Sequence, residues 1–372
     1  MLFAYFNVMI QHYVPKVYLR NFGQAKIKGE KTEWFVDVFD KSKGTFFNTN
    51  IKNICAERHF YTLDDDTKVA KDKLVIERVY SDFIEPMYQR AYDLLTDDRV
   101  IYISEHQRAE ILIGIMQLWS RNPSVLAQIH DSTRITVSKM IQENKIKGIK
   151  GVTYMNEDYS FRDNTDEMIF KSAEVHATKA FKELHLKGTQ EMLEFHAEAK
   201  FQVEKLNDGS QYFTSDNPLI MTDTLSEDPH PFLRSKNFRI ALNKEYSLLI
   251  QHDNRKELNR LYKCYAGGGN AWLANKDVLK QSSRFVITDK SCMESYQKMD
   301  GFMNDEDKEK MISVIRQVVE KLEGDSESEK PRRVMKEFLE KYDKGETNNS
   351  DIQNMYHQTL KLSKEMVKER QK

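Results

Sequence analysis

The pattern of apolar and polar positions divides the chain into a body of mixed character and a charged helical end. Two aromatic runs at residues 33–49 flank an Asp-Lys-Ser-Lys-Gly stretch, which predicts a β-hairpin with a glycine-containing loop. Over residues 69–200 apolar residues recur every three or four positions, which predicts helices. Residues 201–288 alternate between apolar and polar positions and are interrupted by turn signals, which predicts short strands.

Turn and cap residues set the expected limits of the helices. Pro86 interrupts the helical pattern of residues 73–95 and predicts either a kinked helix or two helices in tandem. Ser104 predicts the N-cap of the next helix, which is apolar on nearly all sides and should be central to the core. After Asn122-Pro123 we expect a helix over residues 124–145 and another over 164–198, with a break at Gly188.

In the strand region, Asn207-Asp208-Gly209 predicts a hairpin that joins strands at residues 201–206 and 211–214. Beyond about residue 300, three apolar stripes predict a three-helix appendage. We therefore expect an α+β protein that is mainly α-helical, with a small antiparallel sheet. Its domains are predicted at residues 1–298 and 299–372.

Composition limits the classes of partner. The 57 basic and 58 acidic residues give a formal charge of −1, so nucleic acid would have to bind a local basic cluster. Three scattered cysteines form no disulfide framework, which favours a reducing, cytoplasmic location. The apolar residues 1–10 are too few to cross a membrane and lack a basic leader region, so we expect no membrane partner. We expect a first strand there or a core-buried lead-in to the turn at His12.

The clearest candidate for chemistry is His12. Pro15 fixes the backbone shortly after the imidazole, and Tyr18, Leu19 and Phe22 recur at helical spacing. These residues should anchor the turn that presents His12.

Further polar residues occur in otherwise apolar surroundings. Glu77 and Glu85 are eight positions apart, about two helical turns, and can face one cavity. Gln117 and Arg121 are four positions apart and share one face of the central helix. Asp216 stands where a strand gives way to a turn.

Two motifs carry a resemblance to a known family. His12-Tyr13-Val14-Pro15 is followed by Tyr18-Leu19 and Phe22, and Thr214-Ser215-Asp216-Asn217-Pro218 comes later in the chain. In this order they resemble an uncharacterised, mainly bacterial domain-of-unknown-function family marked by HYVP-x2-YL-x2-F and TSDNP motifs. The resemblance covers roughly residues 10–288, with Asn122 where a threonine is expected. It implies a shared fold and shared polar positions, and no particular activity.

The polar positions support a hypothesis of function, because buried charge is costly unless it is paired or meets a ligand. We predict a nuclease-like, metal-dependent phosphodiester hydrolase. By analogy it would be an effector of toxin or phage (antiviral) defence. A histidine and carboxylates suit Mg²⁺, Mn²⁺ or Zn²⁺, and an arginine and an amide suit a phosphate. The predicted catalytic residues are His12, Glu77, Glu85 and Asp216; the metal ligands are His12, Glu77 and Asp216; and the substrate-binding residues are Arg121 and Gln117.

Structural roles are the alternative for each residue taken singly. His12 would donate to a backbone carbonyl, Arg121 would form a core salt bridge with Glu77 or Glu85, and Asp216 would cap its own turn. The protein would then be a non-catalytic ligand-binding or assembly protein whose C-terminal helices mediate self-association or hold a protein partner. Basic clusters at residues 145–150, 255–260 and 332–333 are the candidate contacts for nucleic acid.

Overall fold

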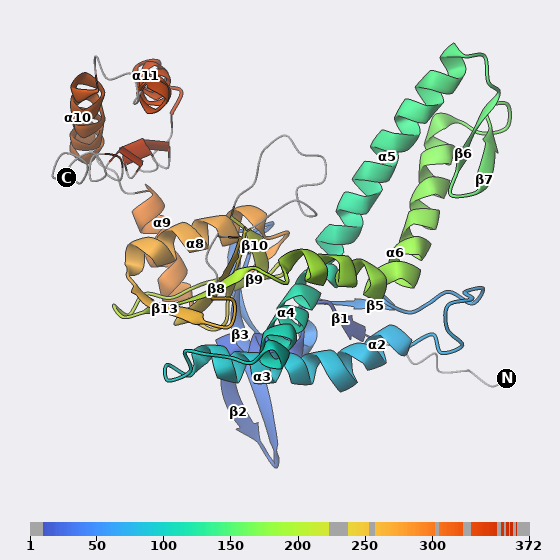
Figure 1. Cartoon of the computed structure of the whole chain (residues 1–372), viewed down its shortest axis with the longest axis horizontal. Helices are drawn as coiled ribbons and strands as arrows, with labels where there is room; N and C mark the ends of the chain where they lie inside the picture. Colours follow the sequence, from blue (N-terminus) through green and yellow to red (C-terminus); the bar gives the residue numbers. More distant parts are fainter. Residues whose placement is uncertain are drawn as a thin grey trace. The chain divides into compact units, whose positions relative to one another are not determined.

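The structure is a computed structural model that describes residues 10–222, 237–252, 257–301, 305–322, 329–347, 351–352, 355–356, 358–359 and 362 (Figure 1). The chain divides into two compact units, residues 1–290 and 291–372. The predicted class is confirmed, since the fold is a mainly helical α+β arrangement with several small sheets. The strand expected near the start falls mostly on residues 1–9, outside the described residues.

The turn that presents His12 is anchored as predicted. Strand β1 (Ile10–His12) pairs antiparallel with β5 (Ala56–Arg58), and the short helix α1 (Lys16–Leu19) follows Pro15 directly. Tyr18 and Leu19 are fully buried, and the Tyr18 hydroxyl donates to the Ala241 carbonyl. The imidazole therefore sits on a backbone that is fixed from both sides.

The first sheet joins the two ends of the larger unit. Its strands are β2 (Gln24–Lys28), β3 (Lys31–Asp40), β4 (Thr45–Asn50), β9 (Thr214–Ser215) and β14 (Phe285–Ile287). The order is β2-β3-β14-β9, and β4 also pairs with β3, which confirms the hairpin predicted at residues 33–49. β14 lies between β3 and β9, so Val38 faces Ile287 in the antiparallel register.

The second sheet has the order β10-β11-β12-β8-β13. Its strands are β8 (Lys200–Leu206), β10 (Leu219–Met221), β11 (Asn237–Ala241), β12 (Tyr246–Gln251) and β13 (Leu261–Ala266). Only β13 runs parallel to its neighbour β8. The predicted hairpin at residues 207–209 is wrong, because β12 and β13 occupy both edges of β8 and Thr214 pairs with β14.

The helices at residues 75–120 pack on one another, and the last of them contacts β10 of the second sheet. Helix α2 (Val75–Val79) continues through a π-helical turn (Tyr80–Ile84) into α3 (Glu85–Thr96), so the helical path is unbroken and the two separate helices in tandem are not present. Pro86 lies in the first turn of α3, directly after the π-helical turn. Helix α4 (Glu105–Ser120) has the predicted Ser104 cap. It packs so closely on α3 that a Cβ at Gly114 would lie 2.9 Å from the Tyr88 Cα.

Two long helices form an arm with a small core of its own (Figure 1). Helix α5 (Pro123–Ile146) packs against α6 (Asp166–His196), and the strands β6 (Gly151–Tyr154) and β7 (Glu157–Ser160) form a hairpin between them. The expected break at Gly188 is wrong, since α6 continues through it. A single glycine costs a helix only about 1 kcal/mol, which the packing along α5 outweighs.

The remaining helices complete the unit of residues 1–290 and form the C-terminal unit. Helix α8 (Gly268–Gln281) lies beside β9 and β10 in the unit of residues 1–290. Helix α9 (Lys290–Gly301) follows β14 and, apart from Lys290, belongs to the C-terminal unit. In the C-terminal unit α10 (Asp305–Lys321) and α11 (Glu329–Asp343) pack together around their own apolar core, as the first two stripes predicted. The third stripe lies largely outside the described residues.

Candidate functional site

A buried guanidinium lies at the end of α4. Arg121 is 1% exposed, and its Nη2 donates to the His12 carbonyl while its own carbonyl accepts from the Tyr61 hydroxyl. The guanidinium carbon lies 4.1 Å from the centroid of the Tyr80 ring. The aromatic faces and the carbonyl hold the cation in place without using all of its donors.

Two carboxylates, those of Glu77 and Glu85, lie near this guanidinium. Arg121 Nη1 lies 3.4 Å from Glu85 Oε1, and the Glu85 side chain is 26% exposed. Burial raises the pKa of Glu77, the charge of Arg121 opposes that shift, and the charge of Glu85 adds to it. The two acids are therefore close enough to repel one another, and the charge of Arg121 attracts both.

Four side-chain atoms in this cluster are buried without a hydrogen-bond partner among the described residues. They are Gln11 Nε2, His12 Nε2, Glu77 Oε2 and Arg121 Nε. Buried polar atoms are almost always paired, and an unpaired one indicates water, an ion or a ligand. We refer to the residues Gln11, His12, Glu77, Glu85 and Arg121 as the Arg121 cluster.

The histidines in and beside the cluster are neutral at pH 7. Burial lowers the pKa of His12 to about 4, and the positive charges of Lys16 and Arg121 act in the same direction. Burial also lowers the pKa of His185 to about 3, and its Nε2 is hydrogen-bonded to the Tyr80 hydroxyl. His12 therefore offers an uncharged imidazole whose Nε2 is unpaired among the described residues.

Two predicted site residues have other partners. Gln117 Oε1 accepts from the Ser120 hydroxyl at 3.0 Å. Asp216 is 3% exposed, and its carboxylate accepts three backbone N–H groups, from residues 283, 284 and 285, at 2.7–2.9 Å. Only its carbonyl is turned towards the end of α4, where it accepts from Asn122 Nδ2 at 2.5 Å. The structure thus gathers four of the six predicted residues.

The predicted ligand set His12, Glu77 and Asp216 does not form a three-ligand metal site. No group of three or more His, Cys, Asp or Glu side chains within the described ranges is arranged to hold a metal ion. The physical reason is that both Asp216 oxygens are taken by backbone N–H groups. Mg²⁺ needs only one or two carboxylates when substrate phosphates supply the other ligands.

Arg108 was not among the predicted site residues, and the structure shows it to be a second buried guanidinium. Its three nitrogens donate to the carbonyls of Ala197, Ala199 and Leu258. It therefore fixes the chain at the starts of β8 and β13. An arginine inside an otherwise apolar helical pattern is the signal that could have identified it.

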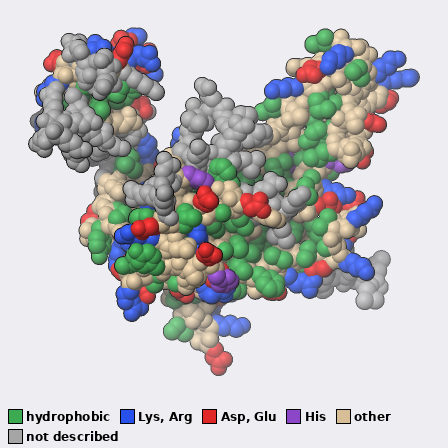
Figure 2. Space-filling view, in the orientation of Figure 1, with side chains coloured by type: hydrophobic (Ala, Val, Ile, Leu, Met, Phe, Trp, Pro, Cys, Tyr) green, Lys and Arg blue, Asp and Glu red, His purple; other side chains and the backbone are tan. Residues whose placement is uncertain are grey.

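The basic cluster at residues 145–150 lies at the far end of the α5–α6 arm, where Figure 2 shows several lysine or arginine side chains on the visible face. Part of this charge is neutralised, since Lys145 lies 2.9 Å from Asp166 and Lys147 lies 3.6 Å from Glu143.

No described helix is both long and apolar enough to cross a membrane.

One protein-family model matches most of the chain. Residues 10–292 match the model of a protein family of unknown function, DUF4238. The chain belongs to this family, and its C-terminal unit lies almost entirely beyond the matched residues. No curated protein and no solved structure was found to match the chain.

Proposed function

We propose that the chain is a hydrolase that cleaves a phosphodiester at the Arg121 cluster. The observation that supports this proposal is the presence of four unpaired buried polar atoms around one guanidinium. They include a cationic donor, a neutral imidazole and a carboxylate of raised pKa, which are the groups that acid–base hydrolysis uses.

The roles follow from the charge and exposure of each side chain. Arg121 Nε donates to a phosphate oxygen and offsets charge in the transition state. His12 Nε2 accepts the proton of the attacking water, since the imidazole is uncharged. Glu77 and Glu85 would hold a divalent ion at the rim, and such an ion supplies positive charge beside the scissile phosphate when bound.

More specifically, we propose a cytoplasmic nuclease-like effector that acts in toxin or phage defence. Nucleic acid is then the substrate. The near-zero net charge gives no attraction of the whole protein to nucleic acid, so the basic end of the α5–α6 arm would supply the local positive surface. The defence role rests on analogy alone.

The test compares two substitutions of equal chemistry. Glu77→Gln removes a rim carboxylate, whereas Glu143→Gln removes an exposed carboxylate on α5. Hydrolysis of bis(4-nitrophenyl) phosphate and of single- and double-stranded DNA and RNA is measured with Mg²⁺, Mn²⁺ or Zn²⁺. We expect Glu77→Gln to lower the rate about a hundredfold or more, with Glu143→Gln unchanged.

Melting curves of both variants distinguish loss of chemistry from loss of fold. The proposal fails if the wild type hydrolyses none of these substrates with any of the three ions. It also fails if both variants retain the wild-type rate.

A non-catalytic assembly protein is the second candidate, and the C-terminal unit favours it. This unit has its own apolar core, and α11 leaves Val334 42% exposed next to a charged face. If these helices mediate self-association, Val334→Glu lowers the mass of the full chain in sedimentation equilibrium. A mass equal to one chain for both wild type and variant excludes self-association through this surface.

A further inference from the structure

A two-stranded ribbon extends from the first sheet beyond the other elements of the larger unit (Figure 1). It consists of β2 and the first part of β3, residues 24–34, which pair antiparallel around the two-residue turn Gly29-Glu30. β4 pairs with β3 only from residue 35 onward, and β14 only from residue 38 onward. Among the described residues, no third strand therefore pairs with this segment. We call it the β2–β3 ribbon.

The ribbon is anchored at its base and open at its end. Trp34 packs against the main apolar core, and a Cβ at Gly23 would lie 2.9 Å from the Phe35 carbonyl oxygen. All five residues of β2 are exposed, and Ile27 is 84% exposed. A two-stranded hairpin is only marginally stable when no other element covers it. A ribbon with so much exposed surface is therefore a candidate for binding a partner.

The strand register gathers lysines on one face of the ribbon. Lys28 lies directly opposite Lys31, and Lys26 lies two residues before Lys28 on the same strand. Side chains of alternate residues, and of residues directly opposite one another, share one face of a sheet, so the three lysines lie on one side. Like charges directly opposite each other destabilise a strand pair. The Lys28–Lys31 pair thus works against the stability of the ribbon and favours an anionic partner.

Few acidic groups compensate this lysine face. Glu33 lies opposite Lys26, and its carboxylate is 3.9 Å from Lys52 Nζ, which brings a fourth cation to the base of the ribbon. Glu30 is exposed in the turn. Lys26 Nζ lies 4.5 Å from the centroid of the Phe35 ring, a contact that leaves its charge in place. No ion pair joins any lysine of this face to a described carboxylate.

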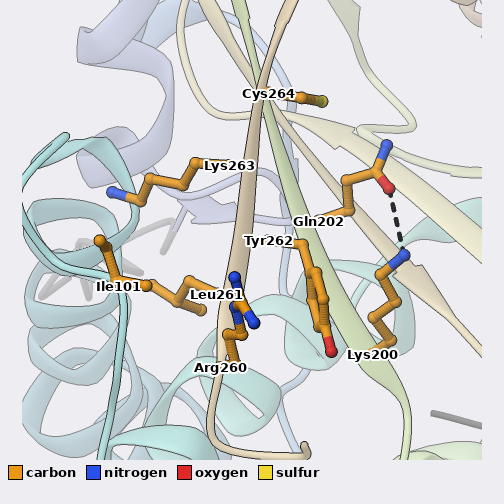
Figure 3. A pocket seen from close by; sticks show the side chains of 8 residues that line it. All are labelled: Ile101, Lys200, Gln202, Arg260, Leu261, Tyr262, Lys263 and Cys264. Atoms are coloured by element: carbon orange, nitrogen blue, oxygen red, sulfur yellow. Dashed lines mark hydrogen bonds between the residues drawn. The ribbon is translucent and has the colours of Figure 1, made fainter.

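The cations at the hollow of about 350 Å³ beside the starts of β8 and β13 are arranged differently (Figure 3). Lys200 lies on the Tyr262 side of β13, whereas Lys263 points to the other side. Lys263 Nζ donates to the Asp97 carbonyl. This hollow does not present its cations to one ligand, so the ribbon is the stronger candidate for binding a polyanion.

We propose that the β2–β3 ribbon binds B-form duplex DNA by entering its major groove. That groove admits a two-stranded ribbon, whereas the major groove of an A-form RNA duplex is too deep and narrow for side chains to read. Lysines gathered on one face complement the phosphates that border the groove. The inference rests on the proposed function, since it names duplex DNA as the substrate class of the hydrolase.

The path of the chain links the ribbon to the turn that presents His12. The short helix η1 (Arg20–Phe22) follows α1 directly, and β2 begins two residues after η1 ends. β3 also contacts η1. DNA held by the ribbon would thus be bound by the segment that continues from the His12 turn.

The test measures binding of a short labelled DNA duplex to the full chain by fluorescence anisotropy, in EDTA so that metal-dependent hydrolysis does not occur. The triple variant Lys26→Gln, Lys28→Gln and Lys31→Gln should weaken binding about tenfold or more. The slope of log K against log salt should become shallower by about 2.7, since each lost phosphate contact removes about 0.9. An RNA duplex of the same sequence should bind the wild type at least about tenfold more weakly than DNA does.

Two control variants separate the lysine face from charge and from the tip in general. Lys43→Gln, Lys68→Gln and Lys71→Gln together remove the same charge from exposed positions outside the ribbon, and should change the affinity by less than about twofold. Ile27→Ser alters the opposite face of the ribbon and should also leave DNA binding unchanged. Circular dichroism melts show whether each variant is folded.

The inference is overturned if the wild type does not bind the duplex, if the two triple variants weaken binding equally, or if duplex RNA binds as tightly as DNA. Binding to phosphatidylserine vesicles that Ile27→Ser abolishes, with no binding to DNA, would assign the ribbon to a membrane surface instead. Glu77→Gln should end hydrolysis and still bind the duplex. A wild type that binds DNA through the ribbon and hydrolyses no phosphodiester would refute the hydrolase and leave the ribbon a DNA-binding element.

Discussion

The substitution Asp216→Asn tests how the TSDNP segment is held. One carboxylate oxygen accepts the Ser283 N–H, and the other accepts those of Arg284 and Phe285. An asparagine keeps the two bonds from the Arg284 and Phe285 N–H groups if its side-chain oxygen takes the place of the second carboxylate oxygen. Its NH2 group then faces the Ser283 N–H, which loses its acceptor. One bond is lost, and two become bonds to a neutral acceptor.

The magnitude follows from these three bonds. A bond to a charged group contributes about 1.5–3 kcal/mol and a neutral one about 1 kcal/mol, so the bonds alone predict a loss of about 2.5–7 kcal/mol. Burial offsets part of this, since it raises the pKa of Asp216 against the pull of the three N–H groups. We expect the free energy of unfolding to fall by about 2 kcal/mol, and Asp216→Ala to cost more because it leaves all three N–H groups unpaired.

Urea unfolding followed by circular dichroism measures this difference. Asp289→Asn is the matched control, because its ion pair with Lys244 is partly exposed and should contribute less than about 1 kcal/mol. If Asp216→Asn costs no more than Asp289→Asn, the carboxylate does not hold the segment that leads into β14, and the structural role assigned to it is wrong.

Three further substitutions or conditions test the packing and the buried charges. Gly114→Ala should destabilise the protein by about 1–3 kcal/mol through contact with the α3 backbone, whereas Gly269→Ala, with open space around it, should be neutral or stabilising in thermal melts. Arg108→Met should lower the free energy of unfolding in urea by about 3 kcal/mol, because one buried and two partly buried hydrogen bonds to carbonyls are lost. The pKa values of His12 and His185 in the folded state are about 4 and about 3, below the ordinary value of 6.5. As the pH falls, the two imidazoles are therefore protonated first in the unfolded chain. The free energy of unfolding should then decrease as the pH falls from about 6.5 towards 4. A double His→Gln variant should show a smaller decrease, and an unchanged pH profile would contradict the burial of both rings.

Local signals predicted much of the fold. Ser104 and Gln107 form the capping box that marks the start of α4, and the first-sheet hairpin follows from its aromatic runs and glycine loop. The β6–β7 hairpin was not predicted. Its turn residues Met155 and Asn156 both adopt positive φ, which a methionine does not signal.

Non-local pairing could not be predicted from the sequence. Gly209 adopts the positive φ expected of a turn, yet the strands on either side of it pair with distant partners. The same limit applies to the site. Arg121 and Glu85 were both predicted as site residues, and they do meet. Asp216 was wrongly predicted as a metal ligand, because the three backbone N–H groups that bind its carboxylate come from residues almost seventy positions away and could not be foreseen.

The place of β14 in the first sheet has a consequence for synthesis of the chain. β3 emerges from the ribosome early, but the strand that covers its second edge is encoded about 250 residues later. Until then β3 presents unpaired N–H and C=O groups, which are open to pairing with other nascent chains. A polypeptide released before residue 285 should therefore aggregate, and completion of the larger unit is coupled to translation of its last strand.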